Sequence, residues 1–574
     1  MDMEQEKLKT GNFRAARQRA ELGGAISDSD FESWDYHILS FQAGHLYRTA
    51  IWVAGIYAAG GAGFLLLNFP DHALAFMLIS FVGWACLMFW HSQGRQGMPV
   101  FPVLAAQLAF LNSLPLLTDN ATLDGLTAST IRVSALTVVL FLMVLAGGWW
   151  LGVRLMQGRP STWNITIRGG AASGGFGLNA ALPLLLLGLA FQLGNISGFN
   201  YKLLPGSLAG LIPVLAAFAG AATSLGAFLG GLTVASRPFQ MGTLAFWTLF
   251  AATFFLSVSG ILLSGACGMV FACTIGLGFG AQRIPWKFLL ATMLLVGFLN
   301  EGKGVMRSRY WDSETSVTRV QLSDLPEFYS EWADASRSAF QNGIFNNDNN
   351  TSNSDEASGG SLLKRLDNFQ NLTFIVDILQ RKEASPLYGA TYSIIPALLI
   401  PRVLWPDKPR THEGQIMLNL NYGRQQNIEQ TYDTYIAWGL LPEAVGNFGC
   451  VGGACFLGLL AGFGCGLLEA WSARKRLLSV EGLIAAALLV ELAVSYEMVA
   501  SVLITSTFQL LVAVVTFGFL LRSWFMDSQL PRRRRPQQRE NLIKAEIGKT
   551  DSGNQTTQAG GQWAQRAKTE SLKS

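Results

Sequence analysis

Long apolar runs dominate this chain and decide which folds are open to it. We count about twelve segments of roughly 20 mainly apolar residues, which is the length that an α-helix needs to cross a lipid bilayer. Charged residues make up only 14% of the sequence, whereas a soluble domain carries about 25%. The sequence therefore predicts an all-α polytopic membrane protein. The predicted spans lie at roughly 49–69, 72–90, 99–117, 131–153, 178–198, 207–234, 241–259, 261–281, 286–300, 450–470, 480–496 and 500–523.

The spacing of the predicted spans divides the chain into successive parts. A polar segment, 1–48, precedes a membrane domain of about nine helices at 49–300. One large polar loop, 301–449, separates that domain from the last three helices at 450–524, and the basic tail 525–574 is predicted to be disordered. Because the chain starts with a polar segment, we expect no cleavable signal peptide.

The short loops between the predicted spans alternate in basic character. Loops such as "HSQGRQG" and "SARKRLL" carry Arg or Lys, whereas "PDH" and "TDNATLDGLTAST" carry neither. Under the positive-inside rule, both termini and the basic loops face the cytoplasm, and the loop 301–449 lies outside. We therefore expect a multi-pass protein of the cytoplasmic membrane with one large extracytoplasmic loop before its last three helices.

The cysteines and histidines do not form a metal-binding or disulfide pattern. The six cysteines lie in or beside apolar runs, none belongs to a Cys-x-x-Cys pair, and the chain has only five histidines. We therefore expect neither a metal site nor a disulfide framework, and no cofactor.

The large loop 301–449 combines an amphipathic helix with a proline-rich basic segment. In "SLLKRLDNFQNLTFIVDIL", apolar residues recur at three- and four-residue spacing, which predicts an amphipathic helix that also carries Arg365. Proline fixes φ, so cations set between prolines are held in place before a ligand binds. The segment "IPRVLWPDKPR" at 400–410 places three such cations: Arg402, Lys408 and Arg410.

Two segments of the loop carry a family resemblance. "GATYSIIPALLIPRVLWPDKP", followed further along by "GLLPEAVGNFGCVGG", resembles the Wzy-type oligosaccharide repeat-unit polymerases, which make bacterial O-antigen or exopolysaccharide. "GKGVMRSRYW" at 302–311, directly after a predicted span, also looks like the basic start of that family's outer loop. The resemblance implies a GT-C-like fold and a metal-independent glycosyltransferase of the bacterial inner membrane. Such an enzyme polymerises repeat units carried on undecaprenyl diphosphate.

The same resemblance implies the partners of the protein. These are the lipid-linked oligosaccharide substrate, the surrounding membrane lipids, a chain-length regulator and a flippase. Nothing in the sequence indicates binding to nucleic acid.

The chemistry of such a transfer gives the candidate residues their roles. Arginine binds phosphate oxygens in a bidentate way and lysine adds a point charge. We therefore expect Lys408 and Arg410 to bind the diphosphate leaving group, and Arg402 to act as a catalytic residue that stabilises its developing charge. A general base must take the proton of the acceptor hydroxyl. We favour Glu443, at the point where the outer loop re-enters the membrane, over His412. The other predicted substrate-binding residues are Trp405, Arg365, Tyr392, Lys303, Arg307, Arg309 and Arg424.

Each of these candidates also has a structural interpretation. A loop arginine in a membrane protein more often contacts a lipid headgroup or an ion-pair partner than takes part in catalysis. The basic residues at 303–309 can equally serve as interfacial anchors, and Glu443 can pair with Arg402 or Arg424. Glu491, in the eleventh predicted span, is a further functional candidate because an ionisable group is costly in lipid.

Three other functions stay open at this stage. A ligase that passes a finished glycan to another acceptor shares the chemistry. A lipid-linked oligosaccharide flippase or transporter predicts ionisable groups scattered through many spans, whereas the spans before residue 300 are almost free of charge. A non-enzymatic assembly subunit would use the large loop as a docking surface.

Overall fold

A computed structural model of the protein describes most of the chain between its two terminal segments. The described residues are 45–93, 97–117, 120, 123, 125–156, 176–203, 211–235, 240–261, 263–281, 283–312, 317–318, 320–345, 367–400, 404–405, 407–433, 436–473, 475, 477–495 and 497–527. The segment up to residue 44, the loop segment 346–366 and the tail from residue 528 lie outside them. The predictions for Arg365 and Arg402 therefore also fall outside the described residues.

Helices account for most of the described residues. Before the large loop they are α3 (His45–Asn68), α4 (Pro70–Ser92), α5 (Val100–Ser113), η2 (Leu114–Leu117), α7 (Ala128–Met156), α8 (Phe176–Ile196), α9 (Phe199–Leu203), α10 (Ile212–Val234), α11 (Met241–Val258), α12 (Leu263–Ala281) and α13 (Trp286–Tyr310). After them come β1 (Trp311–Asp312), β2 (Val317–Thr318), η4 (Leu322–Asp324), α14 (Leu325–Phe345), α16 (Phe369–Arg381), α17 (Ala390–Ser393), α18 (Ile395–Leu398), α19 (Glu413–Asn421), α20 (Ile428–Asp433), α21 (Leu440–Ser472), α22 (Val480–Val494) and α23 (Ala500–Asp527).

The helices reproduce the predicted pattern of membrane spans. In the described part of the chain, 11 helices are long and apolar enough to cross a membrane, and each coincides with a predicted span. The remaining predicted span, 480–496, is occupied by α22, which has 15 residues. β1 and β2 form a short antiparallel pair in which Trp311 lies opposite Thr318. The prediction of an all-α polytopic membrane protein is confirmed.

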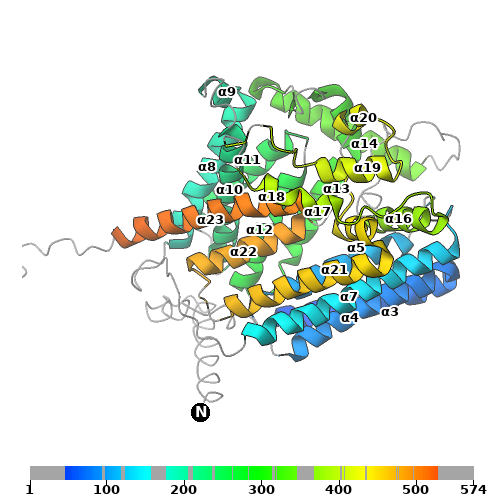
Figure 1. Ribbon diagram of the computed structural model, residues 1–574. Helices are drawn as coiled ribbons and strands as arrows, with labels where there is room; N and C mark the ends of the chain where they lie inside the picture. Colours follow the sequence, from blue (N-terminus) through cyan, green and yellow to red (C-terminus); the bar gives the residue numbers. More distant parts are fainter. Residues whose placement is uncertain are drawn as a thin grey trace, which may run out of the picture.

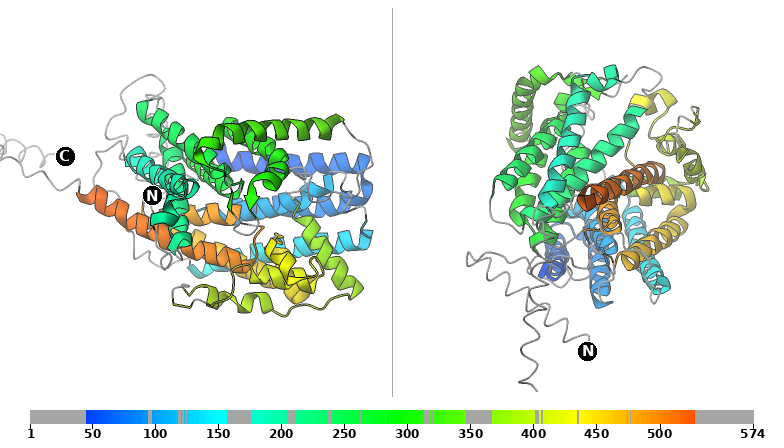
Figure 2. Two further views of the ribbon diagram at one scale, coloured as in Figure 1. Left: turned by 90° about the horizontal axis from the view of Figure 1, so that it is seen from above. Right: turned by 90° about the vertical axis from the view of Figure 1, so that its left-hand side faces the viewer.

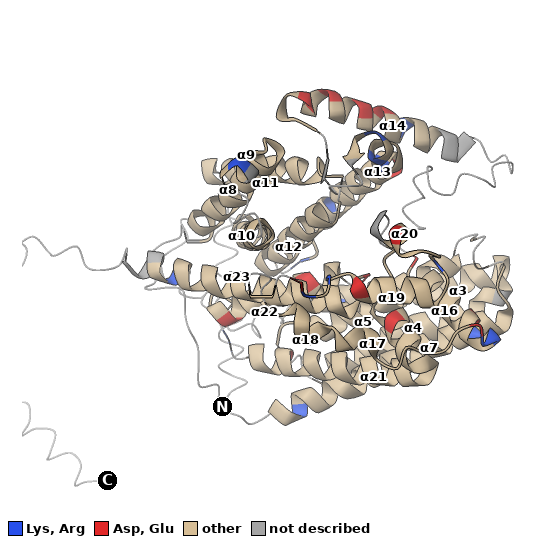
Figure 3. Ribbon diagram, turned by 45° about the horizontal axis from the view of Figure 1, so that its top comes forward, with Lys and Arg blue, Asp and Glu red and all other residues tan. Residues whose placement is uncertain are grey.

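Large apolar side chains cover much of the outer surface. Trp52 of α3 is 74% exposed and Leu67 is 87% exposed. Figure 3 shows the spanning helices almost entirely without charged residues, whereas α14 and other elements of the large loop carry them. An apolar surface of this extent suits a lipid environment and would drive association in water.

The long helices pack in two sets. In one set α3, α4, α5 and α7 pack with one another and α21 packs along α7 (Figure 1). In the other set α10 contacts α8 and α12, and α13 contacts α14. The right-hand view of Figure 2 shows α23 between the two sets, and α22 packs on both α23 and α12. The C-terminal helices therefore join the two halves of the membrane domain.

A stripe of glycines explains the close contact of α21 with α7. Gly458, Gly462 and Gly466 recur at four-residue spacing on one face of α21. A Cβ atom on Gly462 would lie only 2.1 Å from the backbone oxygen of Leu145 in α7. Small residues let two backbones approach and gain dispersion contacts where lipid supplies no hydrophobic driving force. The stripe therefore fixes α21 against α7.

The helix α13 continues beyond the predicted end of its span. We expected the outer loop to begin at residue 301, with "GKGVMRSRYW" as its basic start, but residues 301–310 extend α13. The reason lies in α14, which packs along this extension: Trp332 Nε1 donates to the Leu299 carbonyl at 2.7 Å. Gly302 lies against Trp332 and Ser336, where a Cβ would clash. Tertiary packing thus keeps a polar segment helical.

The remaining elements of the large loop gather at one end of the bundle. The second half of the predicted amphipathic helix is present as α16, which begins at Phe369, and Leu372, Ile375 and Val376 of its predicted apolar face are buried. The short helices α17 and α18 contact α23, and α17 also contacts α19 and α21 (Figure 1). The elements that flank "IPRVLWPDKPR", namely α17 and α18 before it and α19 after it, therefore pack near the first residues of α21 and α23.

Candidate functional site

The helix α21 starts ahead of its predicted span and bends where that span was expected to begin. It starts at Leu440 rather than at residue 450, and Gly449 within it has φ 73°. A break in the helix releases carbonyls from their usual partners. The Gly446 carbonyl accepts from Leu387 N at 3.0 Å, and the Asn447 carbonyl accepts from Tyr388 N at 2.9 Å. The next residue, Gly389, begins the first of the two segments that carry the family resemblance, and its N–H donates to Asn447 Oδ1 of the second at 3.1 Å, so the two segments are hydrogen-bonded to each other.

A buried group of polar atoms lies beside this contact, and we call it the Glu443 cluster. It consists of Thr391, Glu443, Asn447 and the backbone N–H of Ala500. Glu443 is 0% exposed; its Oε1 accepts from Thr391 Oγ1 at 2.7 Å and its Oε2 from Ala500 N at 2.6 Å. Asn447 Nδ2 donates to Thr391 Oγ1 at 2.9 Å, so the Thr391 hydroxyl hydrogen is left for Glu443. Both neighbours donate, which suits the carboxylate form of Glu443.

The position of the Glu443 cluster at the start of α23 adds an electrostatic contribution. Ala500 is the first residue of α23, and a helix N-terminus carries partial positive charge that favours a nearby anion. The cluster therefore ties α17, α21 and α23 together through one carboxylate.

The start of α19 lies against the Glu443 cluster. Ser501 Oγ donates to the Thr411 carbonyl at 3.0 Å. A Cβ atom built on Gly414 would lie 3.8 Å from Glu443 Oε1 and 3.2 Å from Ser501 Oγ. The segment "THEG" at 411–414, which contains the predicted alternative base His412, thus lies next to Glu443.

His412 is held in one orientation and remains partly exposed. Its Nδ1 lies 2.6 Å from Gln415 Oε1. An amide oxygen accepts only, so Nδ1 is assigned as the donor, which places the lone pair of neutral imidazole on Nε2. In this tautomer Nε2 can accept a proton. Both oxygens of Glu443 accept hydrogen bonds within the protein.

Tyr392 of α17 completes an aromatic wall on this side of α21. Its ring is stacked on Phe448 at 5.9 Å between centroids and contacts Phe456 at 5.5 Å. Its hydroxyl is buried and has no hydrogen-bond partner among the described residues. Burial and the nearby Glu443 charge raise the pKa of Tyr392 far above its usual value, so Tyr392 stays a neutral phenol that can donate a hydrogen bond.

Arg424 lies over two aromatic rings that contact each other. Its guanidinium carbon lies 4.7 Å from the centroid of Phe374 and 5.0 Å from that of Trp438. Arg424 Nη1 donates to Asn371 Oδ1 at 2.7 Å, and Asn371 in turn donates to the Ala437 carbonyl. Among the described residues, no ion pair joins Arg424 to a carboxylate. Burial lowers the pKa of Arg424, as expected of a cation that has lost water without gaining an acidic partner.

The described cations of "IPRVLWPDKPR" have different environments. Lys408 Nζ donates to the carbonyls of Leu398 and Ile400 at 2.7 and 2.6 Å, so it closes the loop on itself. Arg410 is exposed, and Trp405 is 42% exposed. Lys408 therefore stabilises the loop, whereas Arg410 and Trp405 lie at its surface.

The predicted basic residues at the end of α13 lie on a different part of the surface. Arg307 stacks over Trp311 at 4.8 Å, and Arg309 lies 3.4 Å from Glu331 of α14. Lys303 is 7% exposed and packs into the interior. Arg307 and Arg309 therefore contact the elements that surround the end of α13.

Sequence reasoning missed three polar groups at this site and one elsewhere. Three of these groups are Thr391, Asn447 and the N–H of Ala500. Thr391 and Asn447 lie in the two segments that carry the family resemblance, but only the tertiary structure brings the three groups together at Glu443. The fourth is Glu469, a carboxylate inside the last turn of the tenth predicted span. Such a residue is costly in lipid, and that cost is the signal that should have marked it.

No metal centre is formed by the described residues. They contain no group of three or more His, Cys, Asp or Glu side chains placed to hold a metal ion. The arrangement instead offers proton acceptors, a phenol donor and a fixed guanidinium at one end of the bundle. No protein-family model, curated protein or solved structure matches the chain.

Proposed function

We propose that this protein is an integral-membrane glycosyltransferase that polymerises undecaprenyl-diphosphate-linked oligosaccharide repeat units. The main support is the hydrogen-bonded contact between the two segments that resemble Wzy-type polymerases. Gly389 N donates to Asn447 Oδ1 at 3.1 Å, and Thr391 and Asn447 both bond to Glu443. Residues far apart in the sequence thus form one polar site, as a transferase requires.

The proposed reaction moves a glycan chain from one lipid carrier to the end of a second lipid-linked repeat. The acceptor hydroxyl oxygen forms a bond to the anomeric carbon of the donor, and the anomeric carbon–oxygen bond to the diphosphate breaks. The bonding electron pair leaves with undecaprenyl diphosphate. The hydroxyl proton passes to a base of the protein.

His412 is the base that the geometry favours. Nε2 of the assigned tautomer carries a lone pair, and His412 is partly exposed. The sequence favoured Glu443 for this role, but both oxygens of Glu443 accept hydrogen bonds in a fully buried position. We therefore assign Glu443 to positioning: it holds α17 and α23 so that α19 presents His412.

Arg424 is the described cation best suited to the diphosphate. Its position is fixed by two rings and one amide, so little ordering entropy is lost when an anion binds. A guanidinium in a water-poor site stabilises negative charge that develops on a leaving group. Arg402, which lies outside the described residues, and the exposed Arg410 are proposed to complete the binding of the diphosphate. The phenol of Tyr392 is proposed to donate a hydrogen bond to the substrate.

The proposed location is the outer face of the bacterial cytoplasmic membrane, with both termini in the cytoplasm. The alternation of basic loops supports this orientation. A chain-length regulator and a flippase are the proposed protein partners. The flippase function itself is less favoured, because charged groups gather at the helix ends and large loop instead of lining many spans (Figure 3).

The lipid-linked glycans that accumulate after deletion of the gene test this proposal. A polymerase predicts single repeats on the outer leaflet, whereas a ligase predicts long unattached polymer and a flippase predicts repeats on the inner leaflet. Purified protein in liposomes should extend added lipid-linked repeats into a ladder. Failure of the reconstituted wild-type protein to form any ladder would refute the proposed activity.

A further inference from the structure

A shallow groove lies beside the bend in α21, outside the Glu443 cluster. Its volume is about 540 Å³, and it is lined by Leu379, Gln380, Lys382, Glu383, Ala384, Ser385, Pro386, Gly449 and Cys450. Because the groove is open to the surface, this volume is that of a surface site for an extended ligand, not of an enclosed pocket. The proposed transfer chemistry uses none of these residues.

The segment 383–387, which we call the strap, forms one side of the groove and is bounded by two residues with positive φ. Lys382 (φ 58°) precedes the strap and Tyr388 (φ 49°) follows it. They are two of only three non-glycine residues with positive φ in the described part of the chain. Lys382 is the left-handed C-cap residue of α16, which is an ordinary way for a helix to end. Tyr388 has no such role, and a non-glycine residue in this conformation persists only where its surroundings fix it. The strap therefore has a fixed path along the groove.

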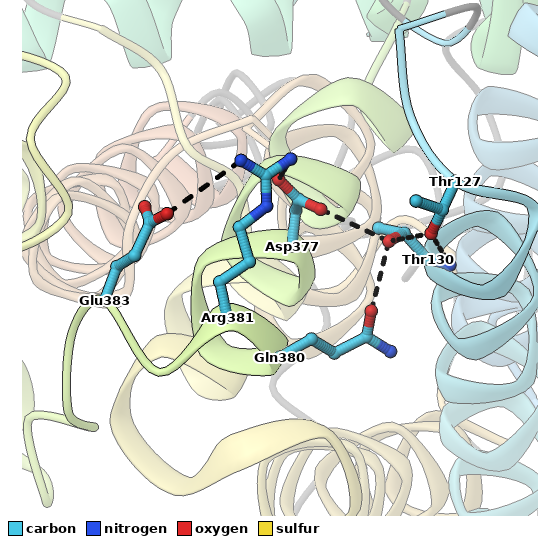
Figure 4. A network of polar contacts seen from close by, with 6 residues as sticks. All are labelled: Thr127, Thr130, Asp377, Gln380, Arg381 and Glu383. Carbon is cyan, nitrogen blue, oxygen red and sulfur yellow. Dashed lines mark hydrogen bonds and ion pairs between the residues drawn. The ribbon is translucent and has the colours of Figure 1, made fainter.

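A network of polar contacts fixes the other side of the groove (Figure 4). Thr130 of α7 lies 3.1 Å from Gln380 Oε1 and 3.3 Å from Asp377 Oδ1. Arg381 lies 2.8 Å from Asp377 and 3.9 Å from Glu383. Figure 4 shows the amide nitrogen of Gln380 directed away from Thr130. The polar groups of the groove are thus oriented before any ligand arrives.

Tyr388 places an aromatic ring at the end of the strap. It is 80% exposed, while its backbone N–H is fixed by the Asn447 carbonyl at 2.9 Å. A rigidly mounted, exposed aromatic ring offers a flat apolar face with a polar tip. Three residues further on, Thr391 bonds to Glu443, so the strap connects the groove directly to the Glu443 cluster.

We propose that this groove, with Tyr388 at its end, binds the sugar residues of a glycan chain next to the site of transfer. This inference rests on the proposed function, because it assigns a place to the chain whose end reacts. Sugars present hydroxyl groups around apolar ring faces. Donors and acceptors such as Gln380, Glu383 and Ser385 suit the hydroxyl groups, and the ring of Tyr388 suits the faces.

The charges of the groove favour a glycan over a lipid headgroup. The charged lining residues are Lys382 and Glu383, one of each sign, and Arg381 nearby is paired with two carboxylates. A site for phosphate would be expected to gather unpaired cations. Few large apolar side chains line the groove, which gives an acyl chain little to pack against. The lining therefore suits a neutral, hydroxyl-rich ligand.

Binding of a carrier-free glycan tests the proposal without any turnover. The probe is the repeat-unit oligosaccharide released by mild acid from the lipid-linked pool of the host, titrated into full-length protein in lipid nanodiscs by calorimetry. Tyr388→Ala should weaken binding by at least about tenfold, which corresponds to about 1.4 kcal/mol. Tyr388→Phe keeps the ring and should bind almost as tightly as the wild type. Phe340→Ala, which removes a 57% exposed ring from α14, is the matched control and should have no effect.

A second variant changes the strap from its other end. Lys382→Gly removes the cation and relieves the positive φ, so the protein should keep its fold while binding of the glycan weakens. Unchanged affinity in both Tyr388→Ala and Lys382→Gly overturns the proposal, as does a wild-type protein that does not bind the probe. Displacement of the glycan by glycerophosphoethanolamine at lower concentration would identify a headgroup site instead. Normal glycan binding by a protein that forms no polymer would refute the proposed function while supporting the groove.

Discussion

Replacement of Glu443 tests whether this carboxylate holds the fold together or accepts the proton. Glu443→Ala leaves two buried donors, Ala500 N–H and the Thr391 hydroxyl, without their acceptor. Each unsatisfied buried donor costs about 1–3 kcal/mol, and removal of a fully buried side chain adds the cost of a cavity. The expected loss of folding free energy is therefore about 3–5 kcal/mol.

Glu443→Gln should be much milder, because its surroundings can adapt. The amide oxygen can keep the bond from Ala500, and the amide nitrogen can donate to Thr391 Oγ1 if the hydroxyl hydrogen turns away. The main loss is a charge-assisted bond that becomes a neutral one, which costs about 1 kcal/mol. Stability should therefore fall in the order wild type, Gln, Ala, and turnover per folded Glu443→Gln molecule should stay within about threefold of the wild type.

The assay combines thermal unfolding in detergent with polymer formation in liposomes, normalised to folded protein. Glu429→Gln, at an exposed carboxylate of α20, is the control and should change neither quantity. A Glu443→Gln protein with full stability but turnover reduced by about 10² or more would refute this reasoning. It would return the role of general base from His412 to Glu443.

Three further outcomes are expected. Asp334 and Gln93 are both exposed, and each can be replaced by cysteine on a cysteine-free background. In intact cells an impermeant reagent should label Asp334→Cys and should not label Gln93→Cys. The reverse result would place the proposed site on the wrong side of the membrane. Arg424→Lys keeps the charge but loses the planar stacking and the fork, so polymer formation should drop by at least about tenfold at normal protein level, whereas unchanged activity would remove Arg424 from the diphosphate site. Glu469→Gln should lower the free energy of unfolding by about 2–3 kcal/mol, measured by chemical unfolding, which is more than the loss in Glu443→Gln. The reason is that the partners of Glu469 are fixed N–H donors, including the indole of Trp149. Equal effects of the two Gln variants would contradict this account.

The membrane spans were predictable because hydropathy reports directly on burial in lipid. The ends of two helices were not, since both are set by neighbours that lie far away in the sequence. Residues 301–310 read as polar loop, yet Trp332 and Ser336 of α14 keep them helical. The first turns of α21 were also predicted to be loop, although they carry Glu443 and Asn447 of the Glu443 cluster. A hydropathy window ends at the first charged residues, whereas a helix ends where its tertiary contacts end.

In the candidate site, too, some features were predictable from the sequence and others depend on tertiary contacts. Individual residues such as Tyr392, Glu443 and Arg424 could be selected from the sequence because polar and aromatic groups at a membrane boundary are unusual. Their partners could not be selected, because Phe374, Trp438 and Asn371 approach Arg424 only after α16 has folded over α21. From the sequence, all three cations of "IPRVLWPDKPR" were predicted to act on the diphosphate. In the structure, Lys408 bonds to backbone carbonyls of the loop itself.

The helix α21 organises the C-terminal half of the protein through a buried carboxylate at each of its ends. Near its start, Glu443 accepts from the first backbone N–H of α23. Near its end, Glu469 is 0% exposed and accepts from Phe101 N at 2.7 Å and from the indole nitrogens of Trp90 and Trp149, each at 2.9 Å.

Phe101 lies in the first turn of α5, so each carboxylate occupies the N-terminus of another helix, where partial positive charge offsets part of the cost of burying an anion. The glycine stripe between the two ends fixes α21 on α7. Glu469 therefore sets how α21 sits among α4, α5 and α7, and Glu443 sets where α17 and α23 meet it.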